Sequence, residues 1–134
     1  MKNVLIIGIL AIIAITAVCA QNSKSGGEDI YTTYEGLYEL METRVQGEDF
    51  FLIDVRTPAE YESGHIPGSM LIPYESIVSP PPTGKKDALI ILYCRSGNRA
   101  GTAEKALEQE GYTNVHNFGG YGKWKGPLRE GKAP

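Results

Sequence analysis

Cysteine is scarce in this sequence. The 134 residues contain two cysteines, Cys19 and Cys94, and Cys19 lies inside an apolar amino-terminal run. Once that run is removed or Cys19 is lipidated, Cys94 has no partner with which to form an internal disulfide. A lone thiol in an oxidising compartment is a hazard unless its reactivity is used, which favours a functional Cys94.

An excess of positive charge is also missing. Thirteen Lys and Arg residues stand against sixteen Asp and Glu residues, for a formal net charge of −3. No basic patch exists outside the loop after Cys94, so no nucleic acid is expected as a partner. There is no internal repeat, and the chain is long enough for one domain with a core but not for two.

The chain has a single long apolar run, from Val4 to Val18, which follows the basic Lys2 and ends in Cys19-Ala20. A basic start, an apolar centre and a small-residue exit are the pattern of a secretory signal, and the run is shorter than the roughly 20 residues of a membrane span. We therefore expect residues 1–20 to be a signal peptide and the protein to be exported.

Three processing outcomes remain open. The first is cleavage after Ala20, which releases a soluble periplasmic protein. The second is lipidation of Cys19, which would anchor the protein on the outer side of the inner membrane, although Val18 is bulky for a lipoprotein signal. The third is an uncleaved anchor. Residues 21–30 are then a flexible linker, 31–128 the folded domain and 129–134 a carboxyl-terminal tail.

Continuous apolar runs predict buried strands at 50–55 and 88–93, with a further strand at 115–118 and a brief apolar piece at 70–72. The first helix is predicted from an N-cap at Thr32 or Thr33 to an end at Gly47, with its apolar face within residues 37–45. Two more are predicted, one from Pro58 to Tyr61 and one along the stripe Ala100, Ala103 and Leu107, which ends at Gly111. Alternating strands and helices predict an α/β fold, in which a small parallel sheet is flanked by helices.

Shorter features carry expectations of their own. Tyr31 is predicted to open a short strand, and Gly119-Gly120 to form a tight turn before a short helix that carries Trp124. Trp124 is expected in the core and His116 at the surface.

The segment from Cys94 to Arg99 is the most informative part of the chain. Cys94 ends a buried strand, Gly97 permits a turn, and a helix follows. Backbone N–H groups and the positive end of the helix dipole should converge on the sulfur, beside Arg95 and Arg99. Such surroundings favour the thiolate and bind anions. The alternative, an inert buried cysteine, is less consistent with this loop.

Three other polar residues are candidates for supporting roles. Asp54 and Arg56 follow the end of the strand at 50–55, where a stabilising ion pair is favoured over catalysis, with substrate contact by Arg56 left open. His65 lies between Gly64 and Ile66 in a turn, and an ionised thiol needs no base, so a structural hydrogen bond is favoured there.

Three separated motifs resemble those of the rhodanese family. They are Ile53-Asp-Val-Arg-Thr-Pro-Ala-Glu-Tyr61 with Gly64-His-Ile-Pro-Gly-Ser69, then Cys94-Arg-Ser-Gly-Asn-Arg99, and finally Asn117-Phe-Gly-Gly120 with Trp124. The resemblance covers residues 31–128 and implies the single-domain rhodanese fold, with its active-site loop at the carboxyl end of a central strand.

The resemblance also implies an activity, that of a thiosulfate sulfurtransferase. Cys94 would take a sulfane sulfur from thiosulfate as a persulfide and pass it to cyanide or a thiol. Substrate would be bound by the loop residues Arg95, Ser96, Gly97, Asn98 and Arg99. The resemblance implies no metal and no organic cofactor, and it leaves the oligomeric state open.

Two rival functions belong to other classes. Phosphatases of related fold use a cysteine loop that is one residue longer than the four residues between Cys94 and Arg99, which disfavours phosphate chemistry. Non-catalytic rhodanese-like modules typically lack the cysteine. An exported persulfide carrier, or a protein-binding or redox module with little turnover, stays open.

Overall fold

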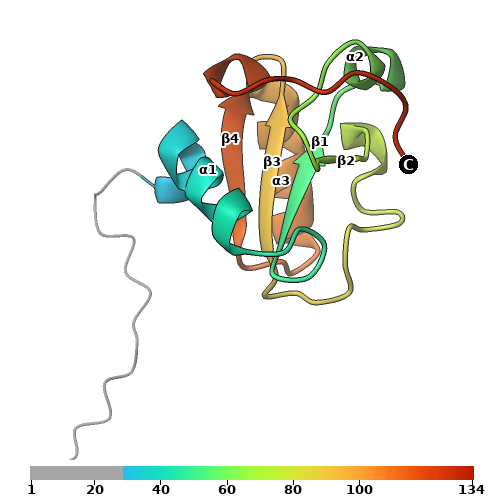
Figure 1. Ribbon diagram of the computed structural model, residues 1–134. Coiled ribbons are helices and arrows are strands. Elements are labelled where there is room, and N and C mark those ends of the chain that lie inside the picture. Colours follow the sequence, from blue (N-terminus) through green and yellow to red (C-terminus); the bar gives the residue numbers. More distant parts are fainter. Residues whose placement is uncertain (1–28) are drawn as a thin grey trace, which may run out of the picture.

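The computed structural model describes residues 29–134, which form a four-stranded parallel sheet flanked by helices (Figure 1). The strand order is β2-β1-β3-β4. The strands are β1 (Phe50–Asp54), β2 (Met70–Leu71), β3 (Leu89–Cys94) and β4 (Val115–Gly120). The α/β fold and the parallel sheet predicted from the sequence are confirmed. The predicted signal peptide, Cys19 and most of the predicted linker lie outside the described residues.

Three α-helices and three short 3₁₀ helices complete the fold. The α-helices are α1 (Tyr34–Thr43), α2 (Pro58–Glu62) and α3 (Asn98–Gln109), and the 3₁₀ helices are η1 (Ile30–Thr32), η2 (Tyr74–Ser76) and η3 (Tyr121–Lys123). Helix α1 begins after an N-cap, Thr33, whose hydroxyl accepts a hydrogen bond from the backbone N–H of Gly36 at 3.1 Å. Helix α2 begins with Pro58, whose missing N–H costs nothing at the first position of a helix.

Helices α1 and α3 lie on opposite faces of the sheet, and each covers a separate apolar cluster (Figure 1). Side chains alternate between the faces along each strand, since successive residues of a strand point to opposite sides. The α1 face buries Leu37, Phe50, Leu52, Ile66, Ile91, Tyr93 and Phe118. The α3 face buries Phe51, Ile53, Ile90, Leu92, Ala100, Ala103 and Leu107, among others. Cys94 follows the parity of Ile90 and Leu92 and therefore lies on the α3 side of the sheet.

The predicted turn at Gly119-Gly120 is wrong, because both glycines belong to β4. Leu92 pairs with Asn117 and Tyr93 with Gly119, so Phe118 is an extra residue in the ladder, a β-bulge. Gly119 adopts a positive φ of 100° at this irregularity. The bulge extends β4 until it lies beside the loop after Cys94.

Four smaller expectations also differ from the structure. Tyr31 lies in the 3₁₀ helix η1 and not in a strand, and Val45 lies beyond the end of α1 with 53% of its surface exposed. Trp124 follows η3 and is only partly buried, packed edge-on against Tyr34. His116 is partly buried, where its ring bonds to Asp29 and, at 2.8 Å, to Asn114.

Within residues 29–134, no helix combines the length and apolar character needed to cross a bilayer. The same part of the chain holds no cluster of three or more His, Cys, Asp or Glu side chains arranged to bind a metal ion. The loops that follow β1 and β3 meet at the carboxyl edge of the sheet.

Candidate active site

Cys94 is the last residue of β3, and its side chain is buried against the first turn of α3. The backbone N–H of Gly97, the N-cap residue of α3, donates a hydrogen bond to Cys94 Sγ at 2.9 Å. A donor aimed at sulfur stabilises negative charge there, and the positive end of the α3 dipole acts in the same direction. The geometry favours a nucleophilic sulfur.

Gly97 is required for this loop on two grounds. Its φ of 99° is in the left-handed region, and a Cβ at this position would lie 3.2 Å from the Cα of Gly119. The end of β4 holds the loop from the other side, because Asn117 Nδ2 donates to the Gly97 carbonyl at 3.0 Å. Asn117 Oδ1 in turn accepts from the N–H of Gly119 at 2.9 Å. The β4 bulge and the cysteine loop therefore support each other.

The close approach continues at Gly120, where a Cβ would lie 2.5 Å from the carbonyl oxygen of Arg95. Any side chain at residue 120 would push the loop away from the sheet. The remaining loop side chains, Arg95, Ser96 and Asn98, are exposed.

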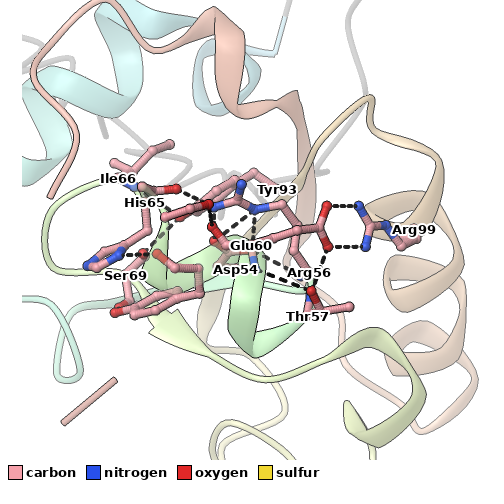
Figure 2. A network of polar contacts seen from close by, with 12 residues as sticks. Asp54, Arg56, Thr57, Glu60, His65, Ile66, Ser69, Tyr93 and Arg99 are labelled. Atoms are coloured by element: carbon pink, nitrogen blue, oxygen red, sulfur yellow. Dashed lines mark hydrogen bonds and ion pairs between the residues drawn. The ribbon is translucent and has the colours of Figure 1, made fainter. Parts of the chain in front are cut away.

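The two loop arginines differ in their surroundings. Arg95 is exposed and forms no ion pair within residues 29–134. Arg99 forms a two-pronged ion pair with Glu60 of α2, with Nη1 to Oε2 at 2.7 Å and Nη2 to Oε1 at 2.9 Å (Figure 2). Hydrogen bonds from Arg99 lower the pKa of Glu60 to about 2, and those to Glu60 raise the pKa of Arg99.

Asp54 and Arg56 form a buried ion pair at the end of β1, with 2.7 Å between Arg56 Nη2 and Asp54 Oδ2 (Figure 2). Arg56 Nη2 also donates to the Gly64 carbonyl at 2.7 Å. Burial by itself lowers the pKa of Arg56, but the hydrogen bonds and charge of Asp54 outweigh it and raise the pKa. The guanidinium lies 4.5 Å from the centre of the Tyr121 ring, which links β1 to the segment after β4.

Comparison with known proteins identifies the family to which the chain belongs. The model of the rhodanese-like domain matches residues 33–127. The chain belongs to the rhodanese-like domain family. The match contains Cys94, both loop arginines and the Asn117–Gly120 segment.

Individual relatives agree with this assignment. The chain is 41% identical over 73 residues to a sulfurtransferase of Allochromatium vinosum, an alignment that covers 54% of this chain and 68% of the relative. It is 36% identical over 70 residues to the thiosulfate sulfurtransferase PspE of Escherichia coli, covering 51% and 67%. A solved structure, a rhodanese with anions from E. coli, has a TM-score of 0.53 at 33% identity and covers 60% of this chain and 98% of its own.

These alignments are partial. In four curated relatives the chain spans between 59% and 68% of the relative's own length. Sulfur transfer is the activity that three of the four are named for, while the fourth is an uncharacterised protein, YqhL of Bacillus subtilis.

In this rhodanese-like domain His65 is buried within the turn between α2 and β2. Its Nδ1 lies 2.8 Å from the Tyr61 carbonyl, which can only accept, so Nδ1 carries the proton. The His65 ring stacks on the Tyr61 ring with 3.6 Å between the centroids. The backbone N–H of each of His65 and Arg129 donates to the carbonyl of the other at 2.9 Å. All these contacts are structural.

Three residues support the site in ways that the sequence does not predict: Glu60, Tyr93 and Asn117. Tyr93 lies within an apolar run, yet its hydroxyl accepts from the Ile66 N–H at 3.0 Å and bonds to Ser69 Oγ at 2.9 Å. Burial raises the pKa of Tyr93, so it stays neutral. Glu60 carried a sequence signal, because Thr57-x-x-Glu60 is the pattern of a capping box.

Proposed function

We propose that this protein is a sulfurtransferase of the thiosulfate type, in which Cys94 carries the transferred sulfur as a persulfide. The Cys94 thiolate attacks the outer sulfur of thiosulfate, forming a new sulfur–sulfur bond. The bond between the outer and central sulfur atoms breaks, and its electron pair leaves with sulfite. The product is a Cys94 persulfide.

The hydrogen bond from the Gly97 N–H to Cys94 Sγ carries this proposal. It places a backbone donor where the thiolate charge resides before attack, in the manner of an oxyanion hole. In the persulfide, the backbone N–H groups of residues 95–99 would donate hydrogen bonds to the outer sulfur. Arg95, which is exposed and free of an ion pair within the described residues, would attract the anionic donor.

The second half of the reaction regenerates the enzyme. Cyanide or a thiolate attacks the outer sulfur of the persulfide, the bond to Cys94 Sγ breaks, and the electron pair returns to the cysteine as thiolate. The acceptor leaves as thiocyanate or as a persulfide. Both half-reactions balance with no redox partner.

Phosphate-ester chemistry is less well supported by the same loop. Only four residues separate Cys94 from Arg99, and Arg99 is already engaged by Glu60. A loop this short, with its arginine occupied, suits a single sulfur better than a tetrahedral phosphate. A carrier or redox module with little turnover would form the persulfide but discharge it slowly, so the test measures both steps.

The decisive experiment uses the full chain, reduced and then freed of reductant. Incubation with thiosulfate should add the mass of one sulfur to the peptide that contains Cys94, and cyanide should remove it with release of thiocyanate. Absence of the added sulfur, with the thiol free and the protein folded, would refute the mechanism. Loading without discharge to cyanide or to thiols would indicate a carrier.

We propose further that the protein is exported and processed near Cys19, on the strength of the apolar run from Val4 to Val18. The mass of the protein recovered from bacterial cells distinguishes the outcomes. Cleavage after Ala20 gives an unmodified chain that begins at Gln21, whereas lipidation gives a chain that begins at a diacylglyceryl-modified Cys19 and partitions into membranes. A chain that retains Met1 in the soluble cytoplasm would contradict export.

A further inference from the structure

The Arg99–Glu60 pair joins two segments that are 39 residues apart in sequence. Arg99 lies in the first turn of α3 and Glu60 in the first turn of α2, with side chains 29% and 31% exposed. Both prongs of the guanidinium are occupied by the two carboxylate oxygens. The positive charge nearest to the start of α3 is therefore neutralised by an acid from another element.

Glu60 is itself fixed in place. Its Oε2 accepts hydrogen bonds from the backbone N–H and the hydroxyl of Thr57, both at 3.0 Å (Figure 2). The first of these bonds, together with that from the Glu60 N–H to Thr57 Oγ1 at 3.3 Å, forms the capping box of α2, so the start of its own helix holds the carboxylate that pairs with Arg99. A carboxylate fixed in this way is a permanent negative charge at the rim of the cysteine loop.

The charge of Arg99 acts on Cys94. Arg99 lies two residues after Gly97, the N-cap residue of α3, whose N–H donates to Cys94 Sγ at 2.9 Å. Because Arg99 is this near to the sulfur along the chain, a change in the net charge of the Arg99–Glu60 pair must change the electrostatic potential at the sulfur. The other ion pair near the end of β1, Asp54–Arg56, is also neutral in sum.

We propose that Glu60 sets the charge preference of the site, because it holds Arg99 in position while cancelling its charge. The site at Cys94 then favours dianionic donors less strongly than the two loop arginines alone would predict. Glu60 is in this sense a positioning and specificity-determining residue and does not touch the reacting atoms. The predicted preference among sulfur donors rests on the sulfurtransferase activity proposed above. The predicted effect of Glu60 on the charge around Cys94 can be tested without that activity.

The test is the substitution Glu60→Gln in the full chain. Glutamine keeps an oxygen for the Thr57 N–H and is itself a residue of capping boxes, so the cap of α2 is retained while the negative charge is lost. The probes are iodoacetate, an anion, and iodoacetamide, its neutral analogue, with modification quantified on the peptide that contains Cys94. The ratio of the two rates reports the potential at the sulfur and cancels changes in accessibility.

Relative to the unsubstituted protein, Glu60→Gln should raise the iodoacetate-to-iodoacetamide ratio about two- to fivefold at low ionic strength, and added salt should reduce the difference. Arg99→Gln, which leaves Glu60 uncompensated, should move the ratio in the opposite direction. Glu35→Gln is the matched control, because it removes one negative charge from an ion pair with Lys125 on the α1 side of the sheet. It should leave the ratio unchanged.

The proposal would be overturned if the iodoacetate-to-iodoacetamide ratio were unchanged in both Glu60→Gln and Arg99→Gln, or if the two variants shifted it in the same direction. Failure of either reagent to modify Cys94 would also overturn it. An assay of sulfur transfer from two donors then separates the role of Glu60 from the proposed sulfurtransferase function. For thiosulfate relative to benzenethiosulfonate, a singly charged donor, kcat/KM should rise in Glu60→Gln by about the same factor as the alkylation ratio. Shifted alkylation without sulfur transfer would refute the sulfurtransferase alone, and transfer without charge dependence would refute the role of Glu60 alone.

Discussion

At the scale of single residues, Cys94 is the position on which the proposed activity depends. Cys94→Ser should abolish sulfur transfer, because a serine hydroxyl is scarcely ionised near neutral pH and cannot form a persulfide. The fold should persist, since serine is nearly the same size and the Gly97 N–H can still donate to Oγ. Thiocyanate formation from thiosulfate and cyanide measures the first effect, and circular dichroism the second. Transfer at the rate of the unsubstituted protein would rule out a persulfide at this residue.

Arg99 should matter more for donor use than for stability. An ion pair about a third exposed contributes only about 0–1 kcal/mol to folding, so Arg99→Ala should shift the free energy of unfolding by no more than that. The variant leaves Glu60 as a net negative charge beside the loop. We expect kcat/KM for thiosulfate to fall by about tenfold. Urea unfolding measures the first quantity and steady-state kinetics the second. A large loss of stability with an unchanged kcat/KM for thiosulfate would contradict this prediction.

At the scale of elements, the cysteine loop depends on Gly97. Alanine at residue 97 would be strained at a φ of 99° and would meet Gly119 of β4 at 3.2 Å. Gly97→Ala should destabilise the protein by about 1–3 kcal/mol and also displace the N–H that faces the sulfur. Gly111→Ala is the matched control, because Gly111 has a φ of 90° and nothing within 4 Å of the added Cβ.

Both glycine variants should therefore lose stability, but only Gly97→Ala should lose sulfur transfer beyond the loss explained by unfolding. Urea unfolding gives the first quantity, and persulfide formation on the folded fraction gives the second. Equal activity per folded molecule in the two variants would show that the loop tolerates displacement.

The ion pair at the end of β1 is a second feature of this scale. Asp54 is fully buried and Arg56 nearly so, and together they join β1 to the carbonyl of Gly64. Asp54→Asn would leave a buried guanidinium without its counter-charge, which should cost about 3–5 kcal/mol of the free energy of unfolding. Glu35→Gln breaks an exposed pair and should leave the urea unfolding midpoint nearly unchanged.

Elements were easier to predict from the sequence than the contacts between them. The strands β1 and β3 follow from apolar runs, and α3 from the spacing of Ala100, Ala103 and Leu107, because these patterns are local. The β4 bulge at Phe118 depends on the register between two strands, so the sequence alone makes this glycine pair resemble a turn. The Arg99–Glu60 pair escaped prediction because α2 and α3 meet only in the folded chain.

At the scale of the whole molecule, the pH dependence of the free energy of unfolding in acid should report on the Arg99–Glu60 ion pair between α2 and α3. The pKa of Glu60 lies at about 2 in the folded state, below an ordinary value of 4.5, because of Arg99 and the Thr57 donors. A carboxyl whose pKa falls on folding stabilises the folded state at pH values above its unfolded pKa. That contribution is therefore complete above about pH 4.5 and is lost as the pH falls toward about 2.

Glu60→Gln removes the carboxyl and with it this pH dependence. The difference in the free energy of unfolding between the unsubstituted protein and Glu60→Gln should thus be constant above about pH 4.5 and shrink toward pH 2. Arg99→Gln should weaken the same dependence, because it removes the largest cause of the shift. Urea unfolding at intervals between pH 2 and 7 measures all three curves. Parallel curves across that window would mean that Glu60 is not held by Arg99 in solution, and the charge balance proposed for the cysteine loop would fail with it.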